Sequence, residues 1–241
     1  MRELAYKVGD VVGDRFLSPP RTAFGNYVNH GPRDRQAIAL TFDDGPSLDS
    51  TERLLDVLGE LDAPSTFFCV GENVRANPDL VRRELDEGHC VGSHSERHSR
   101  GAGLSLSDTR HIEQGEAAIV ETTGFRPTLY RPPWGWLTPW EARRLHKRGY
   151  TIVGWDVYTL DWQIPEPAAG SVADGIVRDT RPGSIICMHD AFPLEERWNK
   201  RVTAETVALI VPRLRDLGFE FVTVDDLLDV PARRPPAESL S

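Results

Sequence analysis

The chain has 241 residues, which is enough for one large α/β domain and within the range where α/β barrels form a single unit. Its hydrophobic fraction of 39% and charged fraction of 27% are ordinary for a soluble globular protein, which is the class that we expect. The formal net charge of −9 provides no basic surface for nucleic acid and opposes binding to anionic membranes, so a neutral or cationic substrate is favoured.

The N-terminal residues show no sign of export or membrane anchoring. No apolar run approaches the roughly 20 residues that cross a bilayer, and the start of the chain lacks a basic region followed by an apolar core and a small-residue cleavage site. Apolar residues at helical spacing in residues 1–12 predict a short helix packed on the domain. A helix on a membrane surface is the weaker alternative, because its polar side is not rich in Lys or Arg.

The three cysteines, Cys69, Cys90 and Cys187, are odd in number, widely spaced and without a CxxC pair. This pattern argues against a disulfide framework and against a structural zinc site. Each cysteine lies in an apolar run, so we expect buried free thiols. Free thiols and the missing export signal together predict a cytoplasmic protein. If the chain is a piece of a longer exported protein, we expect a cell-envelope or secreted one instead.

Strand-like and helix-like segments alternate about seven times along the chain. The alternation implies a parallel sheet and the length favours a barrel, so we expect an α/β fold, a single-domain distorted (β/α) barrel with about seven parallel strands. Strands are expected at residues 36–40, 63–70, 89–92, 126–130, 150–155, 184–188 and 219–224. Helices are expected at residues 50–58, 79–87, 107–120, 139–147, 172–179 and 204–217.

One domain accounts for this pattern, because no fixed-period repeat and no linker divides the chain. We expect the domain to cover residues 35–230. Residues 1–34 are expected to form a lead-in that packs on the domain. Residues 231–241, which are rich in Pro, Arg and Ser, are expected to form a loose C-terminal tail.

Two adjacent carboxylates, Asp43 and Asp44, lie where an apolar strand ends and the turn Gly45-Pro46 begins. In parallel α/β folds, active sites lie at that end of the strands. Neighbouring anions repel in a site partly screened from water, so the pair needs a cation, a proton or a basic partner. The alternative is a solvated turn that merely ends a strand, and the potential cation ligands farther along the chain argue against it.

His94 and His98 are four residues apart after a short expected strand, so on a helix or a tight turn both imidazoles face the same way. With Asp44 they form a two-histidine, one-carboxylate set that suits zinc, iron, cobalt or manganese with coordination positions left open. The pair is not the zinc-protease motif HExxH, because Ser95 stands where that motif carries its catalytic Glu. A surface turn rich in histidine is the alternative.

Five short motifs lie in order along the chain, each at the end of an expected strand. They are Thr41-Phe42-Asp43-Asp44, His94-Ser95-Glu96-Arg97-His98, Arg131-Pro132-Pro133-Trp134-Gly135, Asp161-Trp162 and the region around His189. In content and order these motifs resemble those of the polysaccharide deacetylases, the NodB-homology domain of carbohydrate esterase family 4. The resemblance covers roughly residues 37–228.

The resemblance implies a metal site and a general base. Asp44, His94 and His98 would bind the metal, and the water on that metal would lose much of its pKa. Zinc is the expected metal, with cobalt, nickel, manganese and iron as alternatives. Asp43 would accept the proton of the water as general base. Arg131 would pair with Asp43 and keep it ionised and oriented.

The resemblance also implies groups for the oxyanion and for the leaving amine. The metal and the backbone N–H of Trp134 would stabilise the oxyanion that forms at an N-acetyl carbonyl. His189 would protonate the departing amine, while Asp161 would hold its other ring nitrogen and raise its pKa. Taken alone, His189 is equally consistent with a histidine satisfied in the core.

Aromatic residues gather in the same loops, where their rings could stack on sugars. Trp134 and Trp136 are expected to line a groove. Trp155 lies inside an expected strand, so we expect it in the core. The other members of the group are Tyr158 and Trp162.

Two positions depart from the family pattern. Cys187 stands where the family has Leu, two residues before His189, and we expect retained activity with a looser or altered acyl pocket. Trp134 stands where many members have Tyr. Its role is through the backbone, so we expect catalysis to survive and sugar preference to shift.

We therefore expect a metal-dependent hydrolase that removes an acetyl group from an N-acetylated sugar, through metal-bound water, Asp43 as base and His189 as acid. The favoured substrate is an N-acetylglucosamine-containing polysaccharide or oligosaccharide, such as peptidoglycan or a chitin-like oligomer. O-deacetylation of acetylated xylan and N-deacetylation of a small intracellular amino-sugar metabolite are alternatives, because the same residues serve them.

Two rival classes fit less well. A non-catalytic carbohydrate-binding protein on this fold would lack the base, the acid or a metal ligand, and all of these are in the sequence. A phosphoesterase would carry more basic residues or a second cluster of His and Asp near the site. No protein partner is inferred.

Overall fold

The computed structural model describes residues 27–98, 110–162, 167–191 and 201–235. Its largest feature is a nine-stranded sheet, and a separate two-stranded sheet is formed by β5 (Arg126–Pro127) and β11 (Arg233–Arg234). The nine strands are β1 (Tyr27–Val28), β2 (Ala37–Asp43), β3 (Thr66–Cys69), β4 (Cys90–Ser93), β6 (Leu129–Tyr130), β7 (Thr151–Val153), β8 (Val157–Tyr158), β9 (Ile185–His189) and β10 (Glu220–Phe221).

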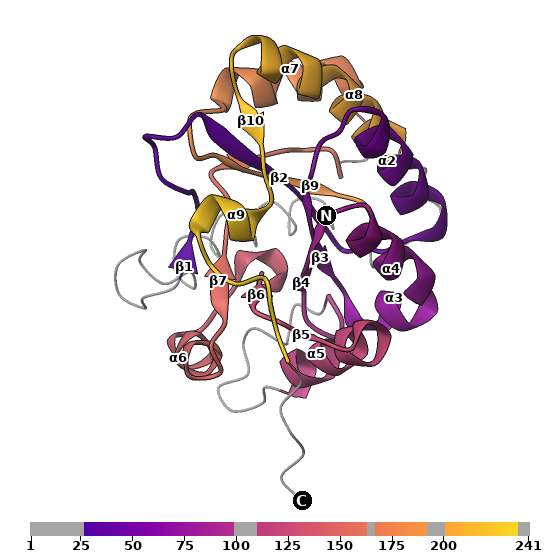
Figure 1. Cartoon of the computed structure of the whole chain (residues 1–241), viewed down its shortest axis with the longest axis vertical. Helices are drawn as coiled ribbons and strands as arrows, with labels where there is room; N and C mark the ends of the chain where they lie inside the picture. Colours follow the sequence, from indigo (N-terminus) through magenta and orange to yellow (C-terminus); the bar gives the residue numbers. More distant parts are fainter. Residues whose placement is uncertain (1–26, 99–109, 163–166, 192–200, 236–241) are drawn as a thin grey trace, which may run out of the picture.

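The strands of the large sheet pair in parallel, in the order β1-β7-β6-β4-β3-β2-β9-β8, with β10 beside β2. Figure 1 shows the sheet curled, with helices around its outer side. A bridge between His30 and Ser184 joins the segment after β1 to the segment before β9, which lies near the other end of this order. The expected distorted (β/α) barrel with about seven parallel strands is confirmed.

Helices connect most of the parallel strands, as crossover connections require. They also pack on one another, α7 against α8, α8 against α2, and α3 against α5, which gives the outer layer visible in Figure 1. The helices are α2 (Leu48–Glu60), α3 (Gly71–Ala76), α4 (Pro78–Asp86), α5 (Arg110–Thr123), α6 (Pro139–Lys147), α7 (Ala169–Asp179), α8 (Arg201–Asp216) and α9 (Val224–Leu228), with a 3-10 turn η2 (Pro133–Gly135).

The start of α6 shows how local sequence sets an element boundary. The Thr138 hydroxyl accepts a hydrogen bond from the Glu141 N–H, and the Glu141 carboxylate accepts one from the Thr138 N–H. This reciprocal cap satisfies backbone donors at the helix start, and Pro139 occupies the first helical position, where no N–H is needed. The helix runs to Lys147, as expected from the sequence.

The central strand β2 is buried along its whole length and separates two apolar clusters. Ile38, Leu40 and Phe42 belong to the cluster that the outer helices cover. Ala37 and Ala39 belong to a second cluster, which includes residues of α9. Because side chains alternate along a strand, Thr41 and Asp43 point to the same side of the sheet as Ala37 and Ala39. The inner side of the barrel therefore becomes polar toward the carboxyl end of β2.

Three expected strands are shorter in the structure, and the one expected at residues 126–130 is divided into β5 and β6. The strand expected at residues 63–70 is reduced to β3. The strand expected at residues 150–155 ends at Val153. The strand expected at residues 219–224 is reduced to β10, because Val224 already begins α9 and its N–H donates to the Thr66 hydroxyl rather than to a neighbouring strand. The helix expected within residues 1–12 lies outside the described residues, as does the start of the helix expected at residues 107–120.

The C-terminal stretch at residues 231–241 is not loose where the structure describes it. Arg233–Arg234 pairs antiparallel with β5. Thr128 anchors the residues before it, since its N–H donates to the Ala232 carbonyl at 3.2 Å and its hydroxyl donates to the Pro231 carbonyl. The expectation of a loose tail is therefore wrong for this part, because hydrogen bonds to a distant strand outweigh the disorder that its composition indicates.

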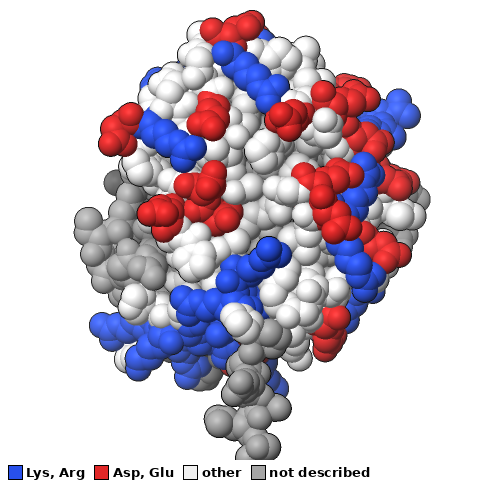
Figure 2. All heavy atoms as spheres, in the orientation of Figure 1, with Lys and Arg blue, Asp and Glu red and all other residues white. Residues whose placement is uncertain are grey.

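The surface charge is unevenly distributed. Figure 2 shows acidic and basic side chains interspersed over the upper and right parts of one face, whereas Lys and Arg gather in its lower left part. α6 lies in that part of the view (Figure 1) and carries the exposed cations Arg143, Arg144 and Lys147. The net charge of −9 is therefore a poor description of this face.

Across the described part of the chain, no helix is both long and apolar enough to span a bilayer.

Candidate active site

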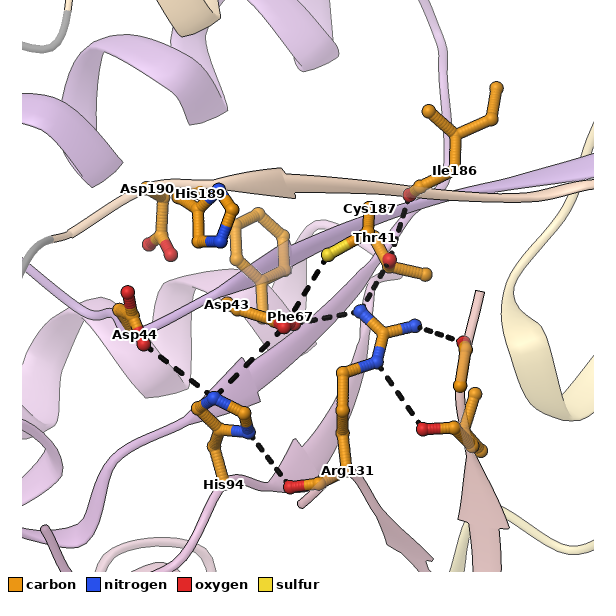
Figure 3. A network of polar contacts seen from close by, with 12 residues as sticks. Thr41, Asp43, Asp44, Phe67, His94, Arg131, Ile186, Cys187, His189 and Asp190 are labelled. Atoms are coloured by element: carbon orange, nitrogen blue, oxygen red, sulfur yellow. Dashed lines mark hydrogen bonds and ion pairs between the residues drawn. The ribbon is translucent and has the colours of Figure 1, made fainter. Parts of the chain in front are cut away.

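The residues expected to carry chemistry lie together at the carboxyl edge of the large sheet. Figure 3 shows five of them, Asp43, Asp44, His94, Arg131 and His189. The strand register pairs Asp43 with His189, and it pairs Ser93, which precedes His94, with Tyr130, which precedes Arg131. Parallel strands end at the same edge, so residues separated by more than a hundred positions become neighbours. The structure brings all eight predicted residues to this edge, namely Asp43, Asp44, His94, His98, Arg131, Trp134, Asp161 and His189.

Asp43 and Arg131 form a buried ion pair. Asp43 is 3% exposed and Arg131 is fully buried. One guanidinium nitrogen of Arg131 donates to Asp43 Oδ1 at 2.7 Å and to Thr41 Oγ1 at 2.7 Å, while the other terminal nitrogen donates to the Gly154 carbonyl at 2.9 Å. The guanidinium also lies 4.1 Å from the centroid of the Phe68 ring. These contacts hold Arg131 in one position beside the carboxylate.

The charges around Asp43 keep it ionised. Burial by itself raises the pKa of Asp43, but the positive charge of Arg131 and its hydrogen bond, together with the charge that His189 and His94 carry when protonated, outweigh burial and hold the pKa below its ordinary value. A carboxylate with a low pKa is a weak base. It can deprotonate water only if another group makes that water more acidic.

Asp44, His94 and His98 converge on one point. Asp44 Oδ1 lies 3.5 Å from His94 Nε2 and 3.4 Å from His98 Nε2, and one ligand atom from each residue lies within 4.8 Å of the others. Asp44 Oδ1 is buried and has no hydrogen-bond partner among the described residues. Buried carboxylate oxygens are otherwise hydrogen-bonded, so this arrangement fits ligands around a cation.

Both histidines can present Nε2 to a metal. His94 Nδ1 lies 2.8 Å from the Arg131 carbonyl, which can only accept, so Nδ1 carries a proton and Nε2, which faces Asp44, is the ring nitrogen left for a metal. Burial lowers the pKa of His98 to about 4, so its imidazole is neutral at neutral pH. A lone pair on Nε2 and a carboxylate oxygen that face each other repel unless a cation lies between them. The three residues therefore fit a divalent metal of the kind that nitrogen and oxygen ligands bind.

Three residues of the site have backbone conformations that side chains rarely adopt. Asp44, Ser95 and Trp134 have positive φ angles of 79°, 73° and 61°. Such conformations cost on the order of 1–3 kcal/mol each and persist only where surrounding contacts hold them. One such contact is a hydrogen bond of 2.7 Å from the Asn73 side chain to the Asp44 carbonyl. The site therefore depends on the loops as much as on the strands.

Asp190 is a structural residue of the site that the sequence analysis missed. Its carboxylate accepts hydrogen bonds from the Gly45 N–H at 3.0 Å and from the Thr51 hydroxyl at 2.5 Å. A Cβ atom at Gly45 would lie 2.0 Å from Asp190 Oδ2, so only glycine fits there. Asp190 thus joins the turn after β2 to the end of β9. The one signal in the sequence was its position directly after His189.

His189 is held by Asp161. Asp161 Oδ1 lies 2.9 Å from His189 Nδ1, and Asp161 Oδ2 accepts the His189 backbone N–H at 2.9 Å. The Thr159 and Thr203 hydroxyls donate to the same carboxylate at 2.7 and 3.1 Å. Burial lowers the pKa of His189, but the negative charge of Asp161, together with those of Asp44 and Asp43, outweighs burial and raises the pKa above its ordinary value. With Nδ1 engaged, Nε2 is the atom that can exchange a proton with a bound molecule.

Two of the aromatic residues contact residues of the site. The Trp134 ring is partly buried and lies against His98, with 4.5 Å between ring centroids, and Trp136 is also partly buried. Trp155 was expected in the core inside a strand, and the strand is wrong, because β7 ends two residues earlier. The half-buried Trp155 ring does pack against the second apolar cluster, and it also stacks on exposed Tyr158 at 5.7 Å between centroids. The Arg131 guanidinium lies 5.6 Å from the centroid of the Trp155 ring, so this residue borders the site.

The three cysteines are buried free thiols, as expected. Cys69 and Cys187 each contact a carboxylate, Cys69 at 3.5 Å from Glu84 Oε2 and Cys187 at 3.5 Å from Asp43 Oδ2. Cys187 is the one whose partner belongs to the site, and it faces the Asp43 oxygen that Arg131 does not bind. Figure 3 shows its sulfur directed toward Asp43. The sequence indicated a residue that lines an apolar acyl pocket, and it gave no sign of this polar contact.

Comparisons with known proteins identify the family of the chain. The family model for polysaccharide deacetylase matches residues 30–153. Peptidoglycan-N-acetylglucosamine deacetylase PgdA of Listeria monocytogenes is 37% identical over 196 residues, which are 81% of this chain and 39% of that protein, so the chain spans less than half of that relative. Chitooligosaccharide deacetylase of Rhizobium leguminosarum bv. trifolii is 34% identical over 199 residues, which are 77% of this chain and 89% of that protein.

The fold also matches a solved structure. The crystal structure of the Bc1960 peptidoglycan N-acetylglucosamine deacetylase superposes with a TM-score of 0.80 at 29% sequence identity, covering 87% of this chain and 95% of the other. The family model accounts for more than half of the residues in the chain, and its matched region includes Asp43, Asp44, His94, His98 and Arg131. The chain belongs to the polysaccharide deacetylase family.

Proposed function

We propose that the protein is a metal-dependent hydrolase that removes an acetyl group from an N-acetylated sugar. The observation that carries this proposal is the position of the ionised Asp43 carboxylate directly beside a separate set of metal ligands, Asp44, His94 and His98. Membership of the polysaccharide deacetylase family supports the reaction class.

A divalent ion held by Asp44, His94 and His98 supplies a Lewis acid that can polarise an acetyl carbonyl and make water more acidic. Asp43 accepts the proton of the attacking water. Its Oδ1 is held by Arg131, so Oδ2 is the oxygen that takes the proton. The lowered pKa suits this role, because Asp43 stays ionised in the resting enzyme and gains a proton only from an acidified donor.

His189 gives a proton to the departing amine from Nε2, while Asp161 on Nδ1 keeps the ring oriented and stabilises its charged form. Because its pKa is raised, His189 remains protonated to a higher pH than an ordinary histidine does. We assign the backbone N–H of Trp134 to the oxyanion, since the contact between Trp134 and His98 places this residue beside the metal ligands.

For the substrate we propose the N-acetylglucosamine units of peptidoglycan or of a chitin-like oligomer. Relatives named peptidoglycan-N-acetylglucosamine deacetylase and chitooligosaccharide deacetylase support this class. O-acetylated xylan and a small amino-sugar metabolite remain the alternatives for the same site. We favour the N-acetyl substrates, because an amine needs a proton in order to leave and His189 can supply one. The alkoxide that leaves from an ester departs more readily without such help.

The test is acetate release by the metal-reconstituted protein from N-acetylglucosamine oligomers, O-acetylated xylan and a small amino-sugar conjugate, each beside a chelated control. Release from the oligomers alone supports the proposal, and release from xylan or from the conjugate alone selects that alternative. If none of the three yields acetate while one metal per chain is bound, the proposed function is wrong.

Replacement of Asp43 by Asn tests the base. We expect turnover to fall by about 10²- to 10⁴-fold with metal binding retained, because Asn keeps the shape of the side chain but has no basic oxygen. Asp56→Asn is the matched control, since Asp56 also pairs with an arginine, Arg83 at 2.7 Å, but is exposed on α2. Undiminished turnover in the Asp43 variant would rule out the assigned role.

A further inference from the structure

Cys187 is part of a second cluster of possible metal ligands that lies next to the first. Cys187 and His189 are two residues apart on β9, so both side chains point to the same side of the sheet, and Asp43 is the register partner of His189 on β2. One ligand atom from each of Asp43, Cys187 and His189 lies within 4.8 Å of the others. Figure 3 shows the three side chains grouped at the strand ends.

Each of the three donors is already oriented by a partner on its other side. Arg131 binds Asp43 Oδ1, which leaves Oδ2 facing the Cys187 sulfur at 3.5 Å. Asp161 binds His189 Nδ1, so Nε2 is the ring nitrogen that can bind an ion once it has lost its proton. In known metal sites, hydrogen-bond partners such as these hold the ligating side chains in place and make them stronger electron donors. Besides its three ligand atoms, the cluster therefore has the hydrogen-bond partners that orient the ligands of a metal site.

From this geometry we propose that Asp43, Cys187 and His189 form a second cation site, which takes a thiophilic divalent ion such as cadmium or excess zinc. A set of one sulfur, one nitrogen and one carboxylate oxygen selects these ions over magnesium and calcium, which prefer oxygen ligands. Binding displaces the proton of the Cys187 thiol and the proton that a charged His189 carries on Nε2, both of which leave to solvent, and no group is oxidised or reduced. The carboxylate and the thiolate together carry two negative charges, which exceeds the single positive charge of Arg131.

Occupation of this site inhibits the reaction. The ion would engage the carboxylate and the imidazole that we assign as base and acid, so neither could move a proton. Two divalent ions can lie about 3.5–4 Å apart in hydrolase sites, so the two neighbouring ligand sets can be filled together. The inhibition rests on the proposed function, whereas the binding itself does not.

Cadmium titration of the metal-free full chain tests the binding without any substrate. A thiolate bound to cadmium gives a charge-transfer absorption in the ultraviolet, and the Asp44, His94 and His98 set contains no sulfur, so this signal reports the second site alone. We expect two cadmium ions per chain in the wild type, one of them accompanied by this absorption. In Cys187→Ala the absorption should be lost and one ion should remain.

Two further variants keep the test clear. Cys187→Leu removes the thiol while filling the space, in case the smaller Ala disturbs folding. Cys90→Ala removes a buried thiol that belongs to no such cluster among the described residues, and it should keep both ions and the absorption. Absorption that survives in both Cys187 variants, or is absent from the wild type, overturns the proposed site.

An activity arm then tests the inhibition separately. If the protein releases acetate, excess zinc should inhibit the wild type. In Cys187→Ala the zinc concentration needed for inhibition should rise by more than about 10- to 100-fold, because metal affinity falls by that factor when a ligand loses only its outer hydrogen-bond partner. Equal zinc sensitivity of the two proteins overturns the inhibitory role. If no substrate yields acetate, the absorption still decides whether the site exists, so the two proposals fail independently.

Discussion

Replacing Arg131 by Met should strongly destabilise the fold, because it leaves the Asp43 carboxylate buried without its cation. Arg131 is fully buried and donates to Asp43 at 2.7 Å and to the Gly154 carbonyl at 2.9 Å. Breaking a buried ion pair by removing one partner costs about 3–5 kcal/mol, and an unpaired buried carbonyl adds about 1–3 kcal/mol. Against a total stability on the order of 5–15 kcal/mol, this loss is large.

Urea unfolding of the metal-free protein, followed by tryptophan fluorescence at neutral pH, measures the change in the free energy of unfolding. Arg35→Met is the control, since Arg35 pairs with Glu220 at 3.2 Å on the surface and should cost at most about 1 kcal/mol. Adding Asp43→Asn to the Arg131 variant should recover part of the loss, with a coupling energy of about 1–3 kcal/mol. A loss no larger than that of the control would refute the idea that Asp43 depends on this buried cation.

Three further outcomes are expected. Asp161→Asn should lower turnover and move the high-pH limb of the rate profile to lower pH, because loss of this charge lowers the pKa of His189 and the proton is lost earlier; an unmoved limb argues against the acid role. Burial raises the pKa of Glu84 well above its ordinary 4.5, so above pH 4.5 the folded state keeps a proton that the unfolded state releases. The free energy of unfolding therefore falls as the pH rises above 4.5. Glu84→Gln should flatten this pH dependence in thermal unfolding curves. His98→Ala should weaken zinc binding measured by calorimetry, because it removes one of the three ligands. Glu52→Ala is the control and should leave zinc binding unchanged, since Glu52 is exposed on α2.

The order of elements and the catalytic edge could be read from the sequence because they depend on local patterns. The apolar run that became β2 ends in two carboxylates, and apolar strands of a parallel sheet end at one edge. Asp43, Asp44, His94, His98, Arg131 and His189 each follow such a run, so their shared location was predictable without knowing which strands are neighbours. The loop conformations were not predictable, since the positive φ at Asp44 is supported by a hydrogen bond from Asn73, which belongs to another part of the chain.

Tertiary structure alone decided which groups touch. β2 lies between β3 and β9, and β9 is more than a hundred residues away along the chain, so periodicity could not place Cys187 against Asp43 or Asp190 under Gly45. The same holds for the C-terminal stretch, whose composition indicated disorder although backbone hydrogen bonds to β5 order part of it. Local sequence specifies how each segment buries its own apolar face. Contacts between distant segments follow from the closure of the whole sheet, whose strand order no single segment encodes.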